Sequence, residues 1–262
     1  MKRLMLLALA LLLPLSAAAG KYTTEKDIIY RKDVKSERCR LDVSYVADTK
    51  DRPVIIWFHG GGLTGGEKST PQRLLSQDYV VVAAGYRLYP EAQVRDIIDD
   101  AAAAVAWVVG NISKYGGSTG KVYLAGHSAG GYLSAMLALD KHYLAKYGVD
   151  PDMFAGIVPY SGQMITHFTE RASRGIPEAR PVVDEMSPLY HIRPDAAPFL
   201  LITGGRNLEM LRRYEENAYF FEMMKYVGHR DISLYEEDGF DHGGMVAPGH
   251  LLLLKYIRER EN

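Results

Sequence analysis

Short apolar runs alternate along the chain with segments of helical length and composition. Because the apolar runs lack a strict alternation of polar and apolar positions, we expect helices to cover both faces of a mostly parallel sheet. The predicted buried strands cover residues 54–58, 80–84, 122–125, 154–158 and 199–203. The predicted helices cover residues 94–109, 130–139, 211–227 and 251–258.

Two runs near the start of the chain, residues 28–30 and 41–45, are more polar than the others. We predict that they form an antiparallel pair at the leading edge of the sheet. A glycine-rich segment, residues 116–120, is typical of a connection.

The longest irregular stretch, residues 162–198, contains five prolines and lies between two predicted strands. Loops of this length are often functional, so we predict a short lid insertion or a substrate-side wall. A solvated excursion without a role is the alternative.

Composition limits the class of protein. A chain of 262 residues with 47% hydrophobic content can bury a large core, and we expect residues 20–262 to form one domain. The net charge of -1 supplies no basic field for a phosphate backbone, so nucleic acid is not an expected partner.

The first 20 residues have the layout of a secretory signal. Two basic residues precede an apolar run over residues 4–13, and small residues follow it. We predict a signal peptide over residues 1–19 and export to the periplasm or the medium. The run is too short to span a bilayer, so no membrane span is expected after cleavage. Cys39 has no partner for an internal disulfide and is interpreted as structural.

The segment Gly126-His127-Ser128-Ala129-Gly130 follows a predicted strand and opens a predicted helix. This is the context that a G-x-S-x-G nucleophile elbow requires, with glycines that permit a strained turn. We therefore predict Ser128 as a nucleophile.

A second glycine motif, His59-Gly60-Gly61-Gly62, follows the strand predicted over residues 54–58. We predict the amides of Gly61, Gly62 and Ala129 as oxyanion-hole donors, with His59 holding the loop. The same loop matches G-x-G-x-x-G, but no helical pattern begins after it, so we expect no nucleotide cofactor.

The base should be a histidine near the C-terminus. His242 lies in a glycine-rich loop between a predicted strand, residues 232–236, and the last predicted helix. We predict His242 as the general base and keep His250, which we expect to begin that helix, as the weaker alternative. The histidines interpreted as surface or structural residues are His142, His167, His191 and His229.

The acid should follow the strand predicted over residues 199–203, but no aspartate stands there. We favour Glu209, although the loop must shift for it to reach His242. Asn207 stands nearer the usual position, and Asp238 and Asp241 are further alternatives.

Together these motifs resemble the α/β-hydrolase esterase and lipase group, which contains hormone-sensitive-lipase-like carboxylesterases and bacterial feruloyl and acetyl-xylan esterases. The resemblance covers most of residues 40–260 and includes Gly85-Tyr86-Arg87-Leu88-Tyr89-Pro90-Glu91. Tyr86 and Arg87 are interpreted as supports of the fold. The group commonly has an aspartate near Asn207, so the acid does not carry over directly.

The resemblance implies an exported serine carboxylesterase that needs no metal or organic cofactor. Its expected substrates are esters of short acyl groups, among them acetyl or feruloyl esters of plant polysaccharides. The alternatives are an amidase similar to aryl formamidases and a non-catalytic hydrolase fold that binds a ligand. The sequence leaves the oligomeric state open.

Overall fold

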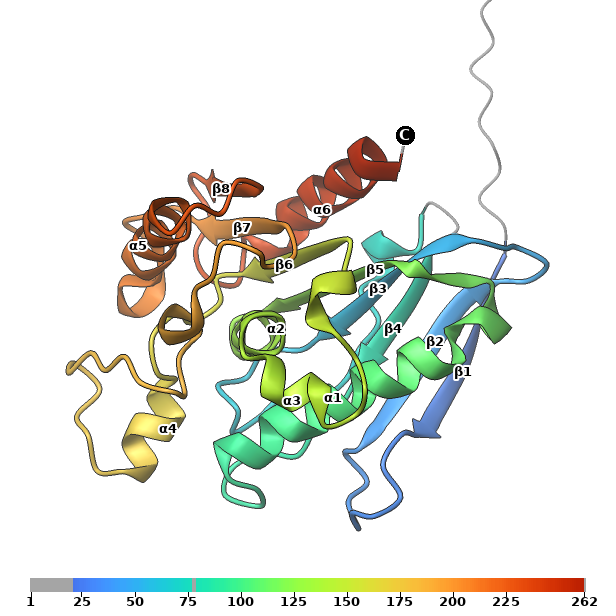
Figure 1. The fold of residues 1–262 in the computed structure, drawn as a ribbon, viewed down its shortest axis with the longest axis horizontal. Helices are drawn as coiled ribbons and strands as arrows, with labels where there is room; N and C mark the ends of the chain where they lie inside the picture. Colours follow the sequence, from blue (N-terminus) through green and yellow to red (C-terminus); the bar gives the residue numbers. More distant parts are fainter. Residues whose placement is uncertain (1–20, 77–78, 262) are drawn as a thin grey trace, which may run out of the picture.

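The computed structural model of the chain describes residues 21–76 and 79–261, so the predicted signal peptide, residues 1–19, lies outside the described residues. The described residues form one eight-stranded sheet in the order β1-β2-β4-β3-β5-β6-β7-β8 (Figure 1). Its strands are β1 (Tyr22–Ile29), β2 (Arg40–Val46), β3 (Arg52–Phe58), β4 (Val80–Ala84), β5 (Gly117–His127), β6 (Gly156–Tyr160), β7 (Phe199–Gly204) and β8 (Ile232–Glu237).

The pairing confirms a mostly parallel sheet with an antiparallel leading pair. Strands β3 to β8 pair in parallel, and β2 pairs antiparallel with both β1 and β4. Of these two strands only β1 has an exposed pattern, because β2 lies between two neighbours and buries most of its residues. The pair forms the leading edge as predicted, but β2 is more buried than its polar sequence indicates.

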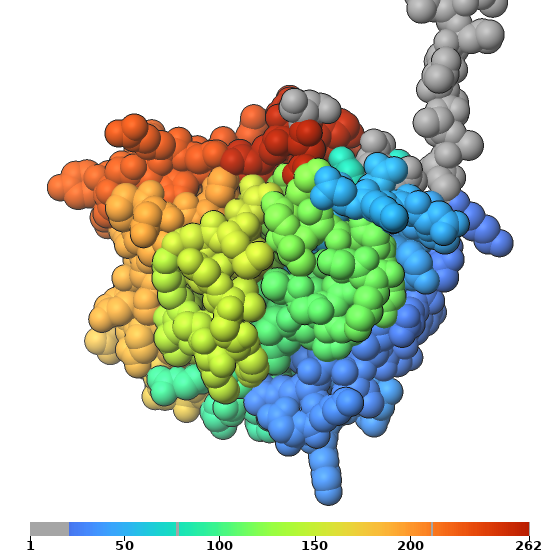
Figure 2. Space-filling model, turned by 45° about the vertical axis from the view of Figure 1, so that its right-hand side comes forward, coloured from blue at the N-terminus to red at the C-terminus, as the bar shows by residue number. Residues whose placement is uncertain are grey.

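Helices cover both faces of the sheet. Alternate residues of β3 enter two separate clusters, since Ile56 packs with α1 and α2 whereas Ile55 packs with α6. Helices α1 and α3 lie side by side on the first face (Figures 1 and 2). The helices are α1 (Val94–Asn111), α2 (Ala129–Leu139), α3 (Lys141–Ala145), α4 (Phe168–Ser173), α5 (Arg213–Tyr226) and α6 (Val246–Glu261). Short 3-10 turns are η1 (Gln72–Leu74), η2 (Ile112–Tyr115), η3 (Pro151–Met153), η4 (Pro188–His191) and η5 (Met210–Arg212).

Several predicted boundaries are wrong. Strand β1 covers Tyr22–Ile29, whereas the predicted run covers residues 28–30. Most of the glycine-rich segment at 116–120 belongs to β5, which begins at Gly117, and β6 begins at Gly156 because Phe154 ends the preceding 3-10 turn. Helix α6 begins at Val246, before Pro248, so His250 does not begin it. Proline is tolerated in a first helical turn because the amides there have no intrahelical acceptor.

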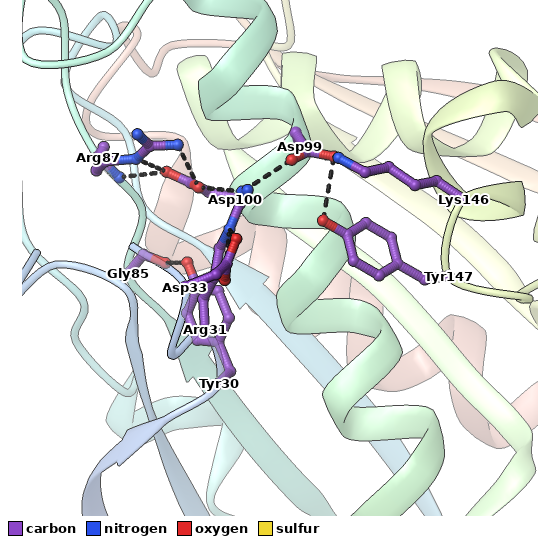
Figure 3. Close-up of polar contacts among 9 residues, drawn as sticks. All are labelled: Tyr30, Arg31, Asp33, Gly85, Arg87, Asp99, Asp100, Lys146 and Tyr147. Carbon is purple, nitrogen blue, oxygen red and sulfur yellow. Dashed lines mark hydrogen bonds and ion pairs between the residues drawn. The ribbon is translucent and has the colours of Figure 1, made fainter. Parts of the chain in front are cut away.

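The buried carboxylate of Asp100 on α1 links the segment after β1 to the segment after β4 (Figure 3). Asp100 has a fully buried side chain and accepts two side-chain hydrogen bonds from Arg87, at 2.7 and 2.8 Å, and one from Arg31 at 2.7 Å. Arg31 also pairs with Asp99, which Lys146 contacts from the segment after α3. The structure thus agrees with the interpretation of Arg87 as a support of the fold.

Replacing Asp100 by alanine is expected to destabilise the protein by about 1.5–3 kcal/mol, because the partly buried Arg87 loses its carboxylate partner while Arg31 keeps Asp99. The free energy of unfolding, measured by urea denaturation, tests this. The matched control is Asp33→Ala, which removes an exposed partner of Arg31 and should cost under about 1 kcal/mol. Equal losses for the two variants would contradict the assignment.

Candidate active site

Ser128 occupies a strained turn between β5 and α2. Its backbone has φ 55° and ψ -111°, a conformation that costs free energy in a residue with a side chain and persists where its surroundings impose it. The Ser128 amide donates to the Tyr160 carbonyl at 2.8 Å. A β-carbon on Gly130 would lie 2.0 Å from the Phe58 carbonyl oxygen, so only glycine allows the helix to start this close to β3. The local structure is that of a nucleophile elbow.

The glycine loop lies beside this turn. A β-carbon on Gly60 would be 3.5 Å from Ser128 Cβ, and Gly61 and Gly62 both have positive φ, at 117° and 64°. Ala129 is the first residue of α2, so its amide has no acceptor within the helix. The glycine loop thus begins beside the serine at Gly60, and Ala129 follows the serine directly.

His59 and Tyr86 support the loop from behind. The two rings stack with centroids 4.2 Å apart, and the Tyr86 hydroxyl donates to the His59 carbonyl at 2.5 Å. The His59 Nδ1 lies 2.7 Å from the Gly60 carbonyl. Burial lowers the pKa of His59, which keeps its ring neutral. Both residues hold the loop, as the sequence predicts.

Glu209 is the acid that reaches His242. Its Oε2 lies 2.8 Å from His242 Nδ1, and its side chain is fully buried. Its Oε1 accepts hydrogen bonds from the Ser161 hydroxyl and from the Gly204 amide, the latter at 2.8 Å. Burial alone raises the pKa of Glu209, but the hydrogen bonds from His242, Ser161 and Gly204 outweigh it and lower the pKa to about 2. Glu209 is therefore ionised at neutral pH.

The other candidate acids lie elsewhere. Asn207 and Asp238 are exposed, and within the described residues neither bonds to His242. Asp241 Oδ1 accepts a hydrogen bond from the Gly244 amide at 2.7 Å and so caps the turn that follows it.

The contacts of His242 define its tautomer. A carboxylate facing Nδ1 can only accept, so Nδ1 carries the proton and Nε2 is left as an acceptor. The buried Nε2 has no hydrogen-bond partner among the described residues. The His242 carbonyl accepts from His127 Nε2 at 2.7 Å, and the two rings lie 4.7 Å apart. Because His127 directly precedes Ser128, His242 lies next to the nucleophile turn.

The remaining histidines do not compete for this place. His250 is buried, and its ring packs 5.0 Å from that of Trp57. His167 and His229 are also buried, whereas His142 is exposed and pairs with Asp140.

Sequence reasoning missed two residues that hold the acid. Ser161 directly follows β6 and has φ 44°; its hydroxyl binds Glu209, while its carbonyl accepts from the fully buried Arg213 at 2.6 Å. A clue was available for Ser161, because residues at the carboxyl ends of parallel strands often line sites. No sequence signal marks Arg213, whose role depends on where α5 packs.

No group of three or more His, Cys, Asp or Glu side chains in the part of the chain that the structure describes could hold a metal ion. None of the helices formed by residues 21–76 and 79–261 is long and apolar enough to cross a membrane. Cys39 is buried, and burial raises the pKa of its thiol to about 11.

Comparisons with known proteins give the site a family context. The model of a family designated BD-FAE matches residues 41–154. Esterase LipC of Mycobacterium tuberculosis is 29% identical to this chain over 254 residues, covering 87% of this chain and 62% of that protein. The chain is similar to esterases and lipases of the α/β-hydrolase group. A probable isoprenylcysteine alpha-carbonyl methylesterase of Oryza sativa, ICMEL1, is 27% identical to this chain over 234 residues, which cover 78% of it and 54% of the rice protein.

Solved structures agree on the fold. Esterase 2 of Thermogutta terrifontis, phosphoramylated by tabun, matches with a TM-score of 0.74 and 23% identity, covering 90% of this chain and 94% of that one. A truncated carbohydrate esterase from gut microbiota matches with a TM-score of 0.76 and 19% identity, over 93% and 98% of the two chains. At these identities the likeness shows the α/β-hydrolase fold. The chain spans less than two thirds of the length of the two curated relatives named above.

Proposed function

We propose that the chain is a serine carboxylesterase that works through an acyl-enzyme. One observation carries the proposal: Glu209 fixes the His242 proton on Nδ1 and leaves Nε2 as an acceptor beside the elbow of Ser128. A general base needs this tautomer to activate a hydroxyl. The roles of Ser128, His242 and Glu209 as nucleophile, base and acid are part of this proposal.

In the proposed first step, Ser128 Oγ attacks the ester carbonyl carbon while its proton passes to His242 Nε2. The amides of Gly61, Gly62 and Ala129 donate hydrogen bonds to the carbonyl oxygen as negative charge develops on it. The carbon–oxygen bond to the alcohol then breaks, and His242 gives its proton to the leaving oxygen. Water attacks the acyl-enzyme in the same way and releases the acid.

The charge of Glu209 stabilises the imidazolium that forms in both steps. Because its pKa is lowered to about 2, Glu209 remains a carboxylate throughout the neutral range. Ser161 and the Gly204 amide bind its Oε1, and Arg213 binds the Ser161 carbonyl in turn.

We propose short acyl groups as substrates, with acetyl or feruloyl esters of plant polysaccharides as candidates. The carbohydrate esterase among the structural neighbours supports this substrate class, as does the signal-like sequence of residues 1–19. Short-chain carboxylic esters in general fit the same site. Export to the periplasm or the medium is part of the proposal.

We also propose that residues 162–198 form a substrate-side wall. The stretch is tied to α2 by a hydrogen bond from the Tyr132 hydroxyl to the Met186 carbonyl at 2.8 Å. Within the stretch, Asp184 accepts from Thr166 at 2.7 Å and pairs with Arg174 at 2.6 Å. These ties favour a fixed wall over a freely opening lid.

The test is expression of the full chain, followed by labelling with a fluorophosphonate and assays on 4-nitrophenyl acetate, butyrate and octanoate. We expect covalent label on Ser128 and hydrolysis that is fastest for the short esters, because His242 contacts His127, the residue before the proposed nucleophile. Release of acetate or ferulate from esterified xylan then tests the polysaccharide substrates. An N-terminus at Gly20 in protein recovered from the periplasm or the medium supports export.

Other outcomes point to the alternatives. Faster turnover of an aryl formamide than of any ester favours the amidase. Absence of both label and hydrolysis in folded protein contradicts the proposal and favours a non-catalytic binding protein.

A further inference from the structure

Phe168, the first residue of α4, stands directly over the glycine loop. A β-carbon placed on Gly62 would lie 2.8 Å from Phe168 Cζ and 3.4 Å from its Cε2, so the edge of the ring already touches this glycine. The neighbouring Thr169 hydroxyl donates to the Gly62 carbonyl. Helix α4 is therefore docked on a residue predicted to hold the oxyanion.

The ring of Phe168 is held in place from behind. The Phe168 amide donates to the buried Gln163 Oε1 at 2.9 Å, and the His167 ring packs 4.4 Å from the phenyl ring. His167 is itself buried against Tyr132 of α2, with ring centroids 5.0 Å apart. The phenyl ring remains only half-buried, so one side of it is open beside the glycine loop.

The position of the Phe168 ring indicates which part of the reacting ester, the acyl chain or the alcohol, lies beside it. Oxyanion-hole donors lie about 2.7–3.1 Å from the oxyanion, and both the acyl chain and the alcohol begin at the carbon that bears it. The alcohol must lie within reach of His242 Nε2, which protonates it as it leaves. His242 packs on His127, on the Gly60 side of the loop, whereas Phe168 packs on Gly62.

We propose that Phe168 limits the length of the acyl group by closing the acyl side of the pocket at Gly62. This inference rests on the proposed esterase function. A short acyl group fits beside the ring, whereas a long chain meets the ring edge. Because the His167 ring packs against Phe168, the phenyl ring does not swing aside without losing that contact.

The experiment compares kcat/KM for 4-nitrophenyl acetate, butyrate and octanoate in wild type, Phe168→Leu and Phe168→Ala. Differences of one methylene in an apolar pocket are worth about 10–200-fold, so we expect the octanoate-to-acetate ratio to rise about tenfold or more in Phe168→Ala. Phe168→Leu, which keeps more of the packing, should give an intermediate ratio. Thermal unfolding of each variant confirms that it is folded.

The matched control is Phe221→Ala, which truncates another partly buried phenylalanine on α5, outside the predicted site. It should lower stability without altering the ratio. A second substrate series, acetates of ethanol, butanol and octanol, should show an unchanged preference in Phe168→Ala.

Two outcomes overturn the inference while leaving the esterase function intact. The first is an octanoate-to-acetate ratio that is the same in all folded variants. The second is a changed preference among the acetates of ethanol, butanol and octanol with no change in that ratio. A wild type that neither hydrolyses esters nor takes the fluorophosphonate label overturns the proposed function as well.

Discussion

Alanine at position 128 is expected to lower kcat for ester hydrolysis by about 10⁶-fold, the loss seen when a serine nucleophile is removed from an assembled triad. The strained elbow at Ser128 supports its proposed role as nucleophile, on which this expectation rests. His242→Ala is expected to cost about as much, since each residue depends on the other. The measurement is kcat for 4-nitrophenyl acetate in purified variants.

The double variant makes the test sharper. If Ser128 and His242 act as one unit, Ser128→Ala with His242→Ala should be no slower than either single variant. His142→Ala is the matched control, because this histidine is exposed and its partner is Asp140, away from the predicted triad. Additive losses, or a Ser128→Ala variant that retains full activity, would rule out the proposed nucleophile.

The sequence predicts the sheet well because its central strands are buried on both faces. The runs at 80–84 and 199–203 match β4 and β7 to within one residue, since continuous apolar runs bounded by turns leave little choice of register. The end of β6 is less clear in the sequence because the strand contains Pro159, which lacks an amide for the ladder. Propensity read along the chain cannot decide such a boundary.

The nucleophile elbow and the glycine loop could be predicted for a local reason. Both need glycine where the backbone has positive φ or where two segments touch, so each can be recognised from a short run of consecutive residues. The residues around the acid are different. Ser161, which follows β6, contacts Glu209, and Arg213 of α5 contacts Ser161, so only the folded chain brings these residues together.

The acid itself depended on the path of one turn. Leu208 and Glu209 both donate their amides to the Gly205 carbonyl, at 2.8 and 3.0 Å, so the chain doubles back after β7. This turn leaves Asn207 exposed and directs Glu209 inward, where its longer side chain reaches His242. A spacing rule based on aspartate could not foresee the turn.

Glu209→Gln is expected to lower kcat by about 10⁴-fold, as amide replacement of the acid does in a serine-protease triad, mainly because the imidazole loses its correct tautomer. The structure makes this a large effect, since Glu209 binds Nδ1 directly and is buried as a carboxylate with a pKa of about 2. The protein should stay folded, because glutamine still accepts from Ser161 and Gly204. The measurement is kcat together with the melting temperature.

Asn207→Ala and Asp241→Asn serve as controls for the competing acids. Asn207 is exposed, and an asparagine at 241 can still accept from the Gly244 amide, so both variants should stay within a few-fold of wild type. Fluorophosphonate labelling should slow in Glu209→Gln but persist, because Ser128 and the glycine loop remain. A loss confined to Asn207→Ala or Asp241→Asn would move the role of the acid to that residue. Full activity in Glu209→Gln would show that the buried carboxylate holds the loop in place and takes no part in catalysis.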